Sequence, residues 1–296
     1  MRARLLKDTA ARHLGRILAI LPGLVLALIT VGLLLRSRPI LDVKPLPDLL
    51  FSTSWHPLRG EFGFLPFIAG TLWVTIAATV LAVPLSVLAA IHLSEYAHRR
   101  VRALMRPLVD LLAGIPSVIY GIWGILIIVP FIKSYLAPAF GATTTGYCVL
   151  AGSVVLAVMV FPILIHVTIE VFQAVPSELR EASLALGATQ WQTIKHVVLR
   201  KARSGIVAAV ILATSRVFGE TMAVLMVVGN VARVPGSVFD PAYPLPALIA
   251  NNYGEMMSVP LYDSALLLAA LVLLVCVVGF NAVAQLVLLR LERKAL

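Results

Sequence analysis

Six apolar stretches, each long enough to cross the roughly 30 Å hydrocarbon core of a membrane as a helix, dominate this sequence. They lie near residues 17–35, 66–93, 108–132, 147–172, 205–229 and 264–289. Hydrophobic residues make up 60% of the chain and charged residues only 13%, which is far from the composition of a soluble domain. No long polar block separates the stretches, so the sequence predicts an all-α, polytopic membrane protein without a separate soluble domain.

The first stretch follows Arg12 and Arg16 and so begins like a secretory signal peptide. Its 19 residues are long for the apolar core of a signal peptide, Arg36 follows directly, and no small-x-small cleavage pattern appears. We therefore expect this stretch to remain as a membrane anchor. The expected organisation is a tail at 1–16, one transmembrane domain at 17–289 and a second tail at 290–296.

Basic residues are distributed unevenly over the segments between the stretches. The two tails and the segments 94–107 and 173–204 together hold 17 Lys and Arg, against 6 in the segments on the other side. The positive-inside rule places the richer side in the cytoplasm. The sequence thus predicts six transmembrane helices in the inner membrane, with both termini inside. Because this rule also accounts for the net charge of +10, we expect contact with membrane lipid and none with nucleic acid.

The cytoplasmic segment 173–204 carries the signals of two short helices joined by a glycine turn. Glu178 follows a Pro-Ser start and suits the positive end of the helix dipole. Gly187 can end that helix in a left-handed conformation. Thr189 followed by Gln192 matches a capping box, which marks the start of a second helix.

The same residues resemble a known family. Glu181-Ala182-Ser183, with Gly187 four residues further on, is similar to the EAA loop of ABC importer permeases. In that family the short helix docks into a groove on a cytoplasmic ATPase and transmits the closure of the ATPase to the membrane helices. The resemblance implies a type I importer permease fold, with Glu178, Glu181, Ala182 and Gly187 in the ATPase-coupling element. The alternative is an amphipathic surface helix without a special role.

The chain departs from this family pattern at two positions. Ser183 stands in place of the second alanine, and Arg200 stands where a proline usually follows the leucine at Leu199. A proline would start or kink a helix there. Arg200 removes that signal, so the shape of this stretch can differ from the family pattern. We expect the second helix to end near Ala202.

Further runs narrow the resemblance to the C-type permeases of high-affinity phosphate uptake (Pst) systems. These runs are GETMAV at 219–224, VGN at 228–230, LPALIANNYGE at 245–255 and LPFI with GTL within 65–72. LAGIPSVIYGIWG at 112–124 is similar to a stretch that both permeases of those systems share. The EAA loop is specific for importer permeases as a class, whereas the GETMAV run points to phosphate.

That resemblance implies a set of partners. They are a homologous A-type permease, two copies of a cytoplasmic ABC ATPase, and a periplasmic phosphate-binding protein that delivers phosphate to the loop 231–263. No Gly-x-x-x-x-Gly-Lys sequence is present, so the chain has no P-loop of its own. We expect ATP and Mg on the partner ATPase, and in this chain no cofactor, no metal site and no catalytic residue. The chain is expected to be a permease subunit and not an enzyme.

Two charges lie inside the fifth stretch. Arg216 is the twelfth of the 25 residues in 205–229, near the expected bilayer midplane, where inserting an arginine costs about 2.5–3.5 kcal/mol. Glu220 follows one helical turn later, so the two charges can form a structural ion pair or face a cavity together. An arginine fork also suits a tetrahedral oxyanion. The resemblance implies that Arg216, Glu220 and the adjacent Thr221 belong to a phosphate pathway.

Two other functions remain open at this point. A permease for another oxyanion, such as sulfate or molybdate, would share the EAA loop, although the GETMAV run argues against it. A secondary transporter or channel would work without ATP, but the helix-turn-helix at 173–204 would then have no purpose. Copurification with an ATP-hydrolysing subunit distinguishes the second alternative.

Overall fold

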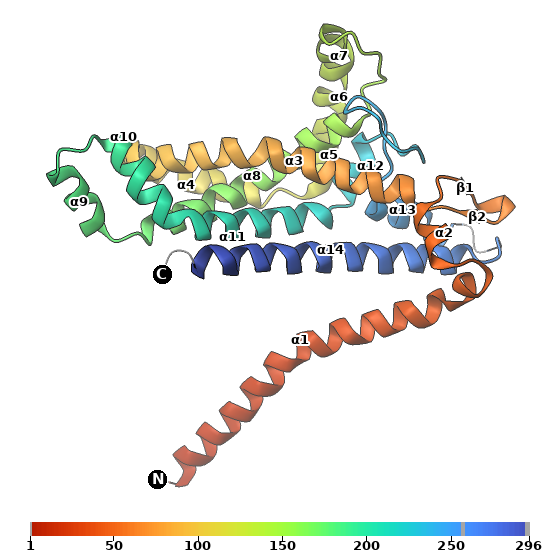
Figure 1. The fold of residues 1–296 in the computed structure, drawn as a ribbon, viewed down its shortest axis with the longest axis horizontal. Coiled ribbons are helices and arrows are strands. Elements are labelled where there is room, and N and C mark those ends of the chain that lie inside the picture. Colours follow the sequence, from red (N-terminus) through yellow and green to blue (C-terminus); the bar gives the residue numbers. More distant parts are fainter. Residues whose placement is uncertain (1, 256–257, 294–296) are drawn as a thin grey trace.

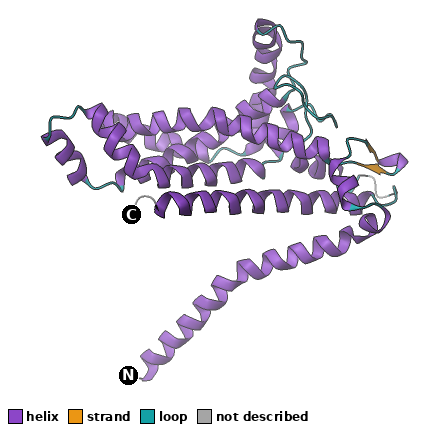
Figure 2. Ribbon diagram, in the orientation of Figure 1, coloured by secondary structure: helices purple, strands orange, loops and turns teal. Residues whose placement is uncertain are grey.

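The computed structural model describes residues 2–255 and 258–293, which are almost entirely helical (Figure 2). Four long helices lie side by side along the long axis of the molecule (Figure 1): α3 (Leu65–Ile91), α8 (Val149–Gln173), α11 (Leu199–Phe218) and α14 (Tyr262–Arg293). At one end of this bundle lie α9 (Ser177–Ala185) and α10 (Gln190–Thr193), and at the other lies a small β-hairpin. The predicted all-α fold is thereby confirmed.

The N-terminal helix, α1 (Arg2–Val43), is continuous and includes most of the predicted tail as well as the first apolar stretch. Its C-terminal part packs on the bundle, where Ile40 is fully buried. The N-terminal part leaves the bundle, and Leu18 and Leu28 on it are exposed. The outer ends of α1 and α14 both lie toward the end that carries α9 (Figure 1). This arrangement agrees with termini on one side of the membrane, although the topology itself stays a prediction.

The opposite end of the bundle is closed by a hairpin and by aromatic side chains. This end of the molecule contains, in chain order, the short helix α2 (Leu46–Phe51), β1 (Trp55–His56), a 3-10 turn (Pro57–Arg59) and β2 (Glu61–Phe62). The strands pair antiparallel, with Trp55 opposite Phe62. The Trp55 ring packs edge-on against Phe67 at a centroid distance of 4.8 Å, and the buried Tyr262 at the start of α14 completes the cluster. Edge-on aromatic packing is favourable, so the hairpin is fixed to α3 and α14.

The most extensive helix pair is α3 with α8, and small residues let the two helices approach closely. Gly152 on α8 faces the Val74 side chain, and a Cβ atom there would be in van der Waals contact with it at 3.5 Å. The buried Ser153 hydroxyl donates to the Val74 carbonyl at 3.2 Å. Small residues at contacts between membrane helices allow this close packing. Around this pair lies the central core, to which α11 also contributes.

The predicted span 108–132 is wrong in its first part. Its opening residues belong to an amphipathic helix, α4 (Arg99–Ala113), and the helix is broken at Gly114 and Pro116. Proline lacks an amide hydrogen and disfavours a helical conformation at the preceding residue, so a new helix begins after it. That helix leaves the bundle (Figure 1) and runs through α5 (Ser117–Trp123), a π-helical turn (Gly124–Ile128), α6 (Val129–Phe131), a second π-helical turn (Ile132–Leu136) and α7 (Ala137–Ala139).

The predicted span 205–229 is not one continuous helix either. α11 ends at Phe218, and α12 (Met222–Val227) begins only after a break at 219–221. A second turn follows, where Gly229 has a φ of 94°. The subsequent loop contains one further helix, α13 (Leu245–Asn252).

Five helices in the described part of the chain are long and apolar enough to cross a membrane. They are Leu14–Val43, Leu65–Tyr96, Ser117–Ala139, Val149–Gln173 and Tyr262–Leu291. α11 falls outside this set because it carries the basic residues Arg200, Lys201, Arg203 and Arg216. The count of six spans therefore stays a prediction, in which α11 and α12 cross the membrane together.

Candidate functional site

The helix-turn-helix predicted for 173–204 is present at one end of the bundle. α9 ends in a Schellman motif, in which the Gly187 amide donates to the Leu184 carbonyl at 2.9 Å and the Ala188 amide donates to the Ser183 carbonyl at 3.2 Å. Gly187 has a φ of 83°. The left-handed turn predicted at Gly187 is therefore confirmed.

The capping box is also confirmed, and the helix that it starts is longer than expected. The Thr189 hydroxyl accepts from the Gln192 amide at 3.2 Å, and the Gln192 side chain accepts from the Thr189 amide at 2.8 Å. The helix then passes through a π-helical turn at Ile194–Val198 directly into α11. The prediction of an end near Ala202 is wrong. Arg200 supplies the amide hydrogen that a proline would lack, so the helix continues without a break.

α9 exposes the residues that the sequence predicts to contact an ATPase. Glu178, Glu181 and Ala182 are all exposed, and no residue of α9 is buried. Apolar side chains accompany them, since Leu184 is 48% exposed and Leu186, just beyond the helix, is 90% exposed. A group of exposed apolar side chains among charged ones is typical of a contact surface for another protein. The roles of the individual residues stay predictions.

Ser183, one of the two departures from the family pattern, makes a contact that alanine cannot make. Its hydroxyl oxygen lies 2.9 Å from the hydroxyl oxygen of Thr193. Thr193 is buried, so this hydrogen bond joins α9 to α10 on the inner side of the loop. The substitution therefore adds a contact within the helix-turn-helix.

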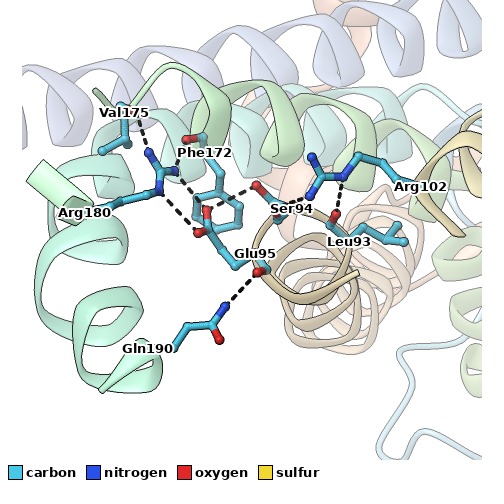
Figure 3. Close-up of polar contacts among 8 residues, drawn as sticks. All are labelled: Leu93, Ser94, Glu95, Arg102, Phe172, Val175, Arg180 and Gln190. Atoms are coloured by element: carbon cyan, nitrogen blue, oxygen red, sulfur yellow. Dashed lines mark hydrogen bonds and ion pairs between the residues drawn. The ribbon is translucent and has the colours of Figure 1, made fainter. Parts of the chain in front are cut away.

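An ion pair that no sequence signal indicated ties α9 to the end of α3 (Figure 3). Arg180 donates to both carboxylate oxygens of Glu95, from Nη2 to Oε1 at 2.9 Å and from Nε to Oε2 at 3.3 Å. The same guanidinium donates to the carbonyl oxygens of Phe172 at 2.7 Å and Val175 at 2.6 Å. The side chains of Glu95 and Arg180 are 11% and 21% exposed. The pair is therefore largely removed from water.

Glu95 belongs to a π-helical turn, His92–Tyr96, which extends α3. The side-chain amide of Gln190 donates to the Glu95 carbonyl at 2.8 Å, so α10 contacts the same residue (Figure 3). From α4, Arg102 donates to two carbonyl oxygens of this turn at 2.9 and 2.6 Å. Four helices, α3, α4, α9 and α10, thus meet at one π-helical turn.

Arg216 and Glu220 do not form the predicted pair one helical turn apart. Arg216 lies in the last turn of α11, whereas Glu220 lies beyond the end of that helix. The ion pairs among the described residues do not include one between these two side chains. The end of α11 tightens into 3-10 geometry, since the Gly219 amide donates to the Arg216 carbonyl and the Glu220 amide to the Val217 carbonyl. This tightening breaks the spacing on which the prediction depended.

Each of the two charges instead lies at a helix end of the opposite sign. Arg216 is exposed at the C-terminal, negative end of α11. Glu220 Oε1 accepts from the Ala223 amide at 3.5 Å, at the N-terminal, positive end of α12. Both positions are favourable for the helix dipole. The break at 219–221 is thus stabilised on both sides by its own charged residues.

Glu220 borders a small cavity together with residues of α3. Its lining includes Thr71 and Thr75, and its accessible volume of about 10 Å³ is at the lower limit for one water molecule. Arg216 and Thr221 are absent from the lining. The structure therefore brings Glu220 together with two threonines at this cavity, which Arg216 and Thr221 do not line. Of the threonines, Thr71 lies in a run that resembles the phosphate permeases, whereas nothing in the sequence pointed to Thr75.

These features define a class of protein: a bundle of membrane helices with an exposed, internally capped helix-turn-helix at one end and no P-loop in its sequence. This is the arrangement that the resemblance to importer permeases predicted for the membrane domain and its coupling loop. In agreement, the chain belongs to the family described as binding-protein-dependent transport system inner membrane components, which matches residues 82–295. The predictions of an ABC importer permease and of an inner-membrane location are confirmed.

Three relatives between 36% and 39% identical cover from 81% to 98% of the chain. A phosphate transport system permease protein PstC from Xylella fastidiosa strain 9a5c is 36% identical, over 98% of this chain and 94% of that protein. The protein of the same name from Mesorhizobium japonicum is 37% identical, over 83% and 80%. A probable ABC transporter permease protein, YqgH from Bacillus subtilis, is 39% identical, over 81% and 77%.

Solved structures of ABC transporters share the fold. A chain of a bacterial ABC transporter involved in the import of the acidic polysaccharide alginate matches with a TM-score of 0.62 and 16% identity, over 97% of this chain and 99% of that chain. A chain of the MetNI methionine ABC transporter, in an inward-facing conformation, matches with a TM-score of 0.58 and 19% identity, over 75% and 93%. At these identities the likeness shows the fold alone.

Proposed function

We propose that this chain is the C-type permease subunit of an ATP-driven importer of inorganic phosphate. The observation that carries the proposal is the similarity to proteins named phosphate permeases, at 36% identity over 98% of the chain in one case and 37% over 83% in another. A probable phosphate permease from Methanocaldococcus jannaschii is 33% identical over 78% of the chain. The GETMAV run that resembles these permeases comprises the break at 219–221 and the first residues of α12.

The family to which the chain belongs works with an ATPase and a substrate-binding protein. We infer a specific assembly, in which this chain pairs with an A-type permease, two copies of the ATPase and a periplasmic phosphate-binding protein. ATP and Mg bind to the ATPase, and this chain binds no cofactor and catalyses no reaction. The exposed Glu178, Glu181 and Leu186 would contact the ATPase, and Gly187 would fix the angle at which α9 is presented.

We assign Arg216 to the phosphate pathway. Its planar guanidinium donates parallel hydrogen bonds and stays charged, which suits a phosphate ion. Its exposure on the single chain supports a position that faces the A-type permease, across a pathway shared by the two subunits. Glu220 would repel phosphate, so we assign it the role of balancing Arg216 when phosphate is absent. Thr221, next to Glu220, is assigned to the same pathway.

Uptake of radiolabelled substrate in cells that lack and then regain this chain tests the proposal. We expect the chain to restore phosphate uptake and to leave sulfate and molybdate uptake unchanged. Restored uptake of sulfate or molybdate would show that this oxyanion, and not phosphate, is the substrate. Absence of any restored uptake, with the chain assembled on its ATPase, would contradict an import function.

A further inference from the structure

We propose that the Glu95–Arg180 ion pair is the link through which movement of α9 reaches α3, and that α3 carries this movement to the cavity beside Glu220. The proposal rests on the proposed function, in which α9 docks on the ATPase. It adds two residues, outside the EAA pattern, that position the moving parts relative to each other.

The first step concerns how α9 is held. No residue of α9 is buried, and its packing against other elements is mainly with α10 and the π-helical turn that follows it. The Ser183–Thr193 hydrogen bond also stays within the helix-turn-helix. Arg180 therefore supplies the main side-chain contact between α9 and α3, a membrane helix that does not adjoin α9 in the chain.

The second step concerns the geometry of the pair. The Arg180 guanidinium makes four hydrogen bonds, two to Glu95 and two to carbonyl oxygens at the end of α8. A planar fork that binds both oxygens of a carboxylate fixes distance and angle together. Because both side chains are largely buried, separating them would leave an uncompensated charge away from water. When α9 moves, Glu95 is therefore expected to move with it.

The third step concerns the turn that carries Glu95. The turn accepts hydrogen bonds from Gln190 of α10 and from Arg102 of α4, in addition to those from Arg180 of α9. The hydrogen bonds of three other helices therefore converge on the end of α3 (Figure 3). π-helical turns are uncommon and frequently lie at functional sites. A force on Glu95 thus acts on an end of α3 whose position relative to α4 and α10 is fixed by hydrogen bonds.

The last step is the length of α3 itself. From Glu95 to Thr75 the chain is helical over about 20 residues, or about 30 Å at the rise of an α-helix. Along this part of α3, the buried Ala78, Ala82 and Ala90 share hydrophobic cores with residues of α8. Thr71 and Thr75 on α3 border the cavity that Glu220 also lines. One continuous helix, with Pro84 inside it, therefore connects the ion pair at the coupling loop with the cavity at the helix break.

The test measures movement at both ends of this path in the purified complex of the chain with its partners. Cys148 and Cys276 are first replaced by alanine, and a single cysteine is then placed either at Ser177 on α9 or at Thr75. The rate of cysteine modification by a maleimide is compared before and after trapping the ATPase with ATP and vanadate. Thr75 is only 3% exposed, so its modification reports opening of the cavity.

In the parent protein, trapping should change the modification rate at least fivefold at both positions. In Glu95→Gln and in Arg180→Gln, the response at Ser177→Cys should persist, whereas the response at Thr75→Cys should fall below twofold. Arg180→Lys keeps the charge without the fork, and its response at Thr75→Cys should be intermediate. Arg99→Gln is the matched control and should respond like the parent. Arg99 is an exposed arginine of α4, and the ion pairs among the described residues do not include it.

A normal response at Thr75→Cys in Glu95→Gln and Arg180→Gln would overturn the proposal. So would loss of both responses together with loss of assembly, because the pair would then only stabilise the fold. The assay needs no transported substrate, so a wrong assignment of phosphate would appear in the uptake experiment and leave this result unaffected. Absence of a response at Ser177→Cys in the parent would contradict the docking of α9 and this proposal together.

Discussion

Replacing Gly187 by alanine should impair transport without unfolding the protein. Gly187 has a φ of 83°, and a Cβ atom there would meet no other atom within 4 Å. The whole cost is therefore conformational, about 1–2 kcal/mol for an L residue in the left-handed region. That energy corresponds to about a 5- to 30-fold decrease in the equilibrium constant between the native turn and its alternatives. Valine is β-branched and should cost more than alanine.

The chain offers a matched control for this substitution. Gly141 has a φ of 67° and equally open surroundings, but it lies in the loop after α7 and not in the helix-turn-helix. Gly141→Ala therefore carries a similar backbone penalty far from α9. A general loss of stability would affect both variants, whereas misplacement of α9 would affect only Gly187→Ala.

The assay is the initial rate of phosphate uptake, normalised to the amount of chain that copurifies with the ATPase. We expect Gly187→Ala to lower this rate by up to about 5- to 30-fold, the factor set by the conformational penalty. Gly187→Val should lower it further, and Gly141→Ala should remain near the parent value. Unchanged uptake and ATPase association in Gly187→Val would refute the assignment of the coupling loop.

Three other predictions test the topology, the pathway and the capping box. Reporter fusions within 94–107 should report the cytoplasm and those within 231–263 the periplasm; termini on opposite sides would contradict six spans. Uptake per assembled complex should stay low when Arg216→Gln is combined with Glu220→Gln, because phosphate still lacks its cationic partner, whereas near-normal uptake would assign Arg216 to structure. Thr189→Ala should cost about 0.5–2 kcal/mol of local stability, seen as faster amide hydrogen exchange in α10 but not in α8, and unchanged exchange would argue against the cap.

The coupling loop was predictable from the sequence because its signals are local. The capping box joins Thr189 to a residue three positions away, and the Schellman motif needs only a glycine one position past the C-cap residue. Such signals keep their meaning whatever the rest of the chain does. The predicted loop geometry therefore agreed with the structure around Gly187.

The Glu95–Arg180 pair was not predictable in the same way. The two residues are 85 positions apart, and each alone fits an ordinary charge near a cytoplasmic membrane boundary. Their contact depends on the packing of α3 against α8, which brings the end of α3 beside the start of α9. Without knowledge of that packing, nothing distinguishes these charges from solvated ones.

The two helix breaks, at 114–116 and 219–221, are features that a hydropathy analysis of the sequence does not detect. Gly114 and Pro116 were visible in the sequence, but membrane helices tolerate such residues as kinks, and only the structure distinguishes a kink from a break. At 219–221 the surrounding run stays apolar, so a window average cannot detect three non-helical residues. The expected placement of Arg216 and Glu220 one helical turn apart on one face failed for this reason, since it assumed a continuous helix.

The most direct test of the central claim is phosphate accumulation in vesicles that contain this chain with its A-type permease and ATPase. Phosphate-loaded binding protein is supplied at the periplasmic face, and ATP at the ATPase face. We predict accumulation that requires hydrolysable ATP, requires the binding protein and is lost in Gly187→Val. Equal accumulation without ATP or without the ATPase subunit would contradict the claim, because the chain would then transport phosphate on its own.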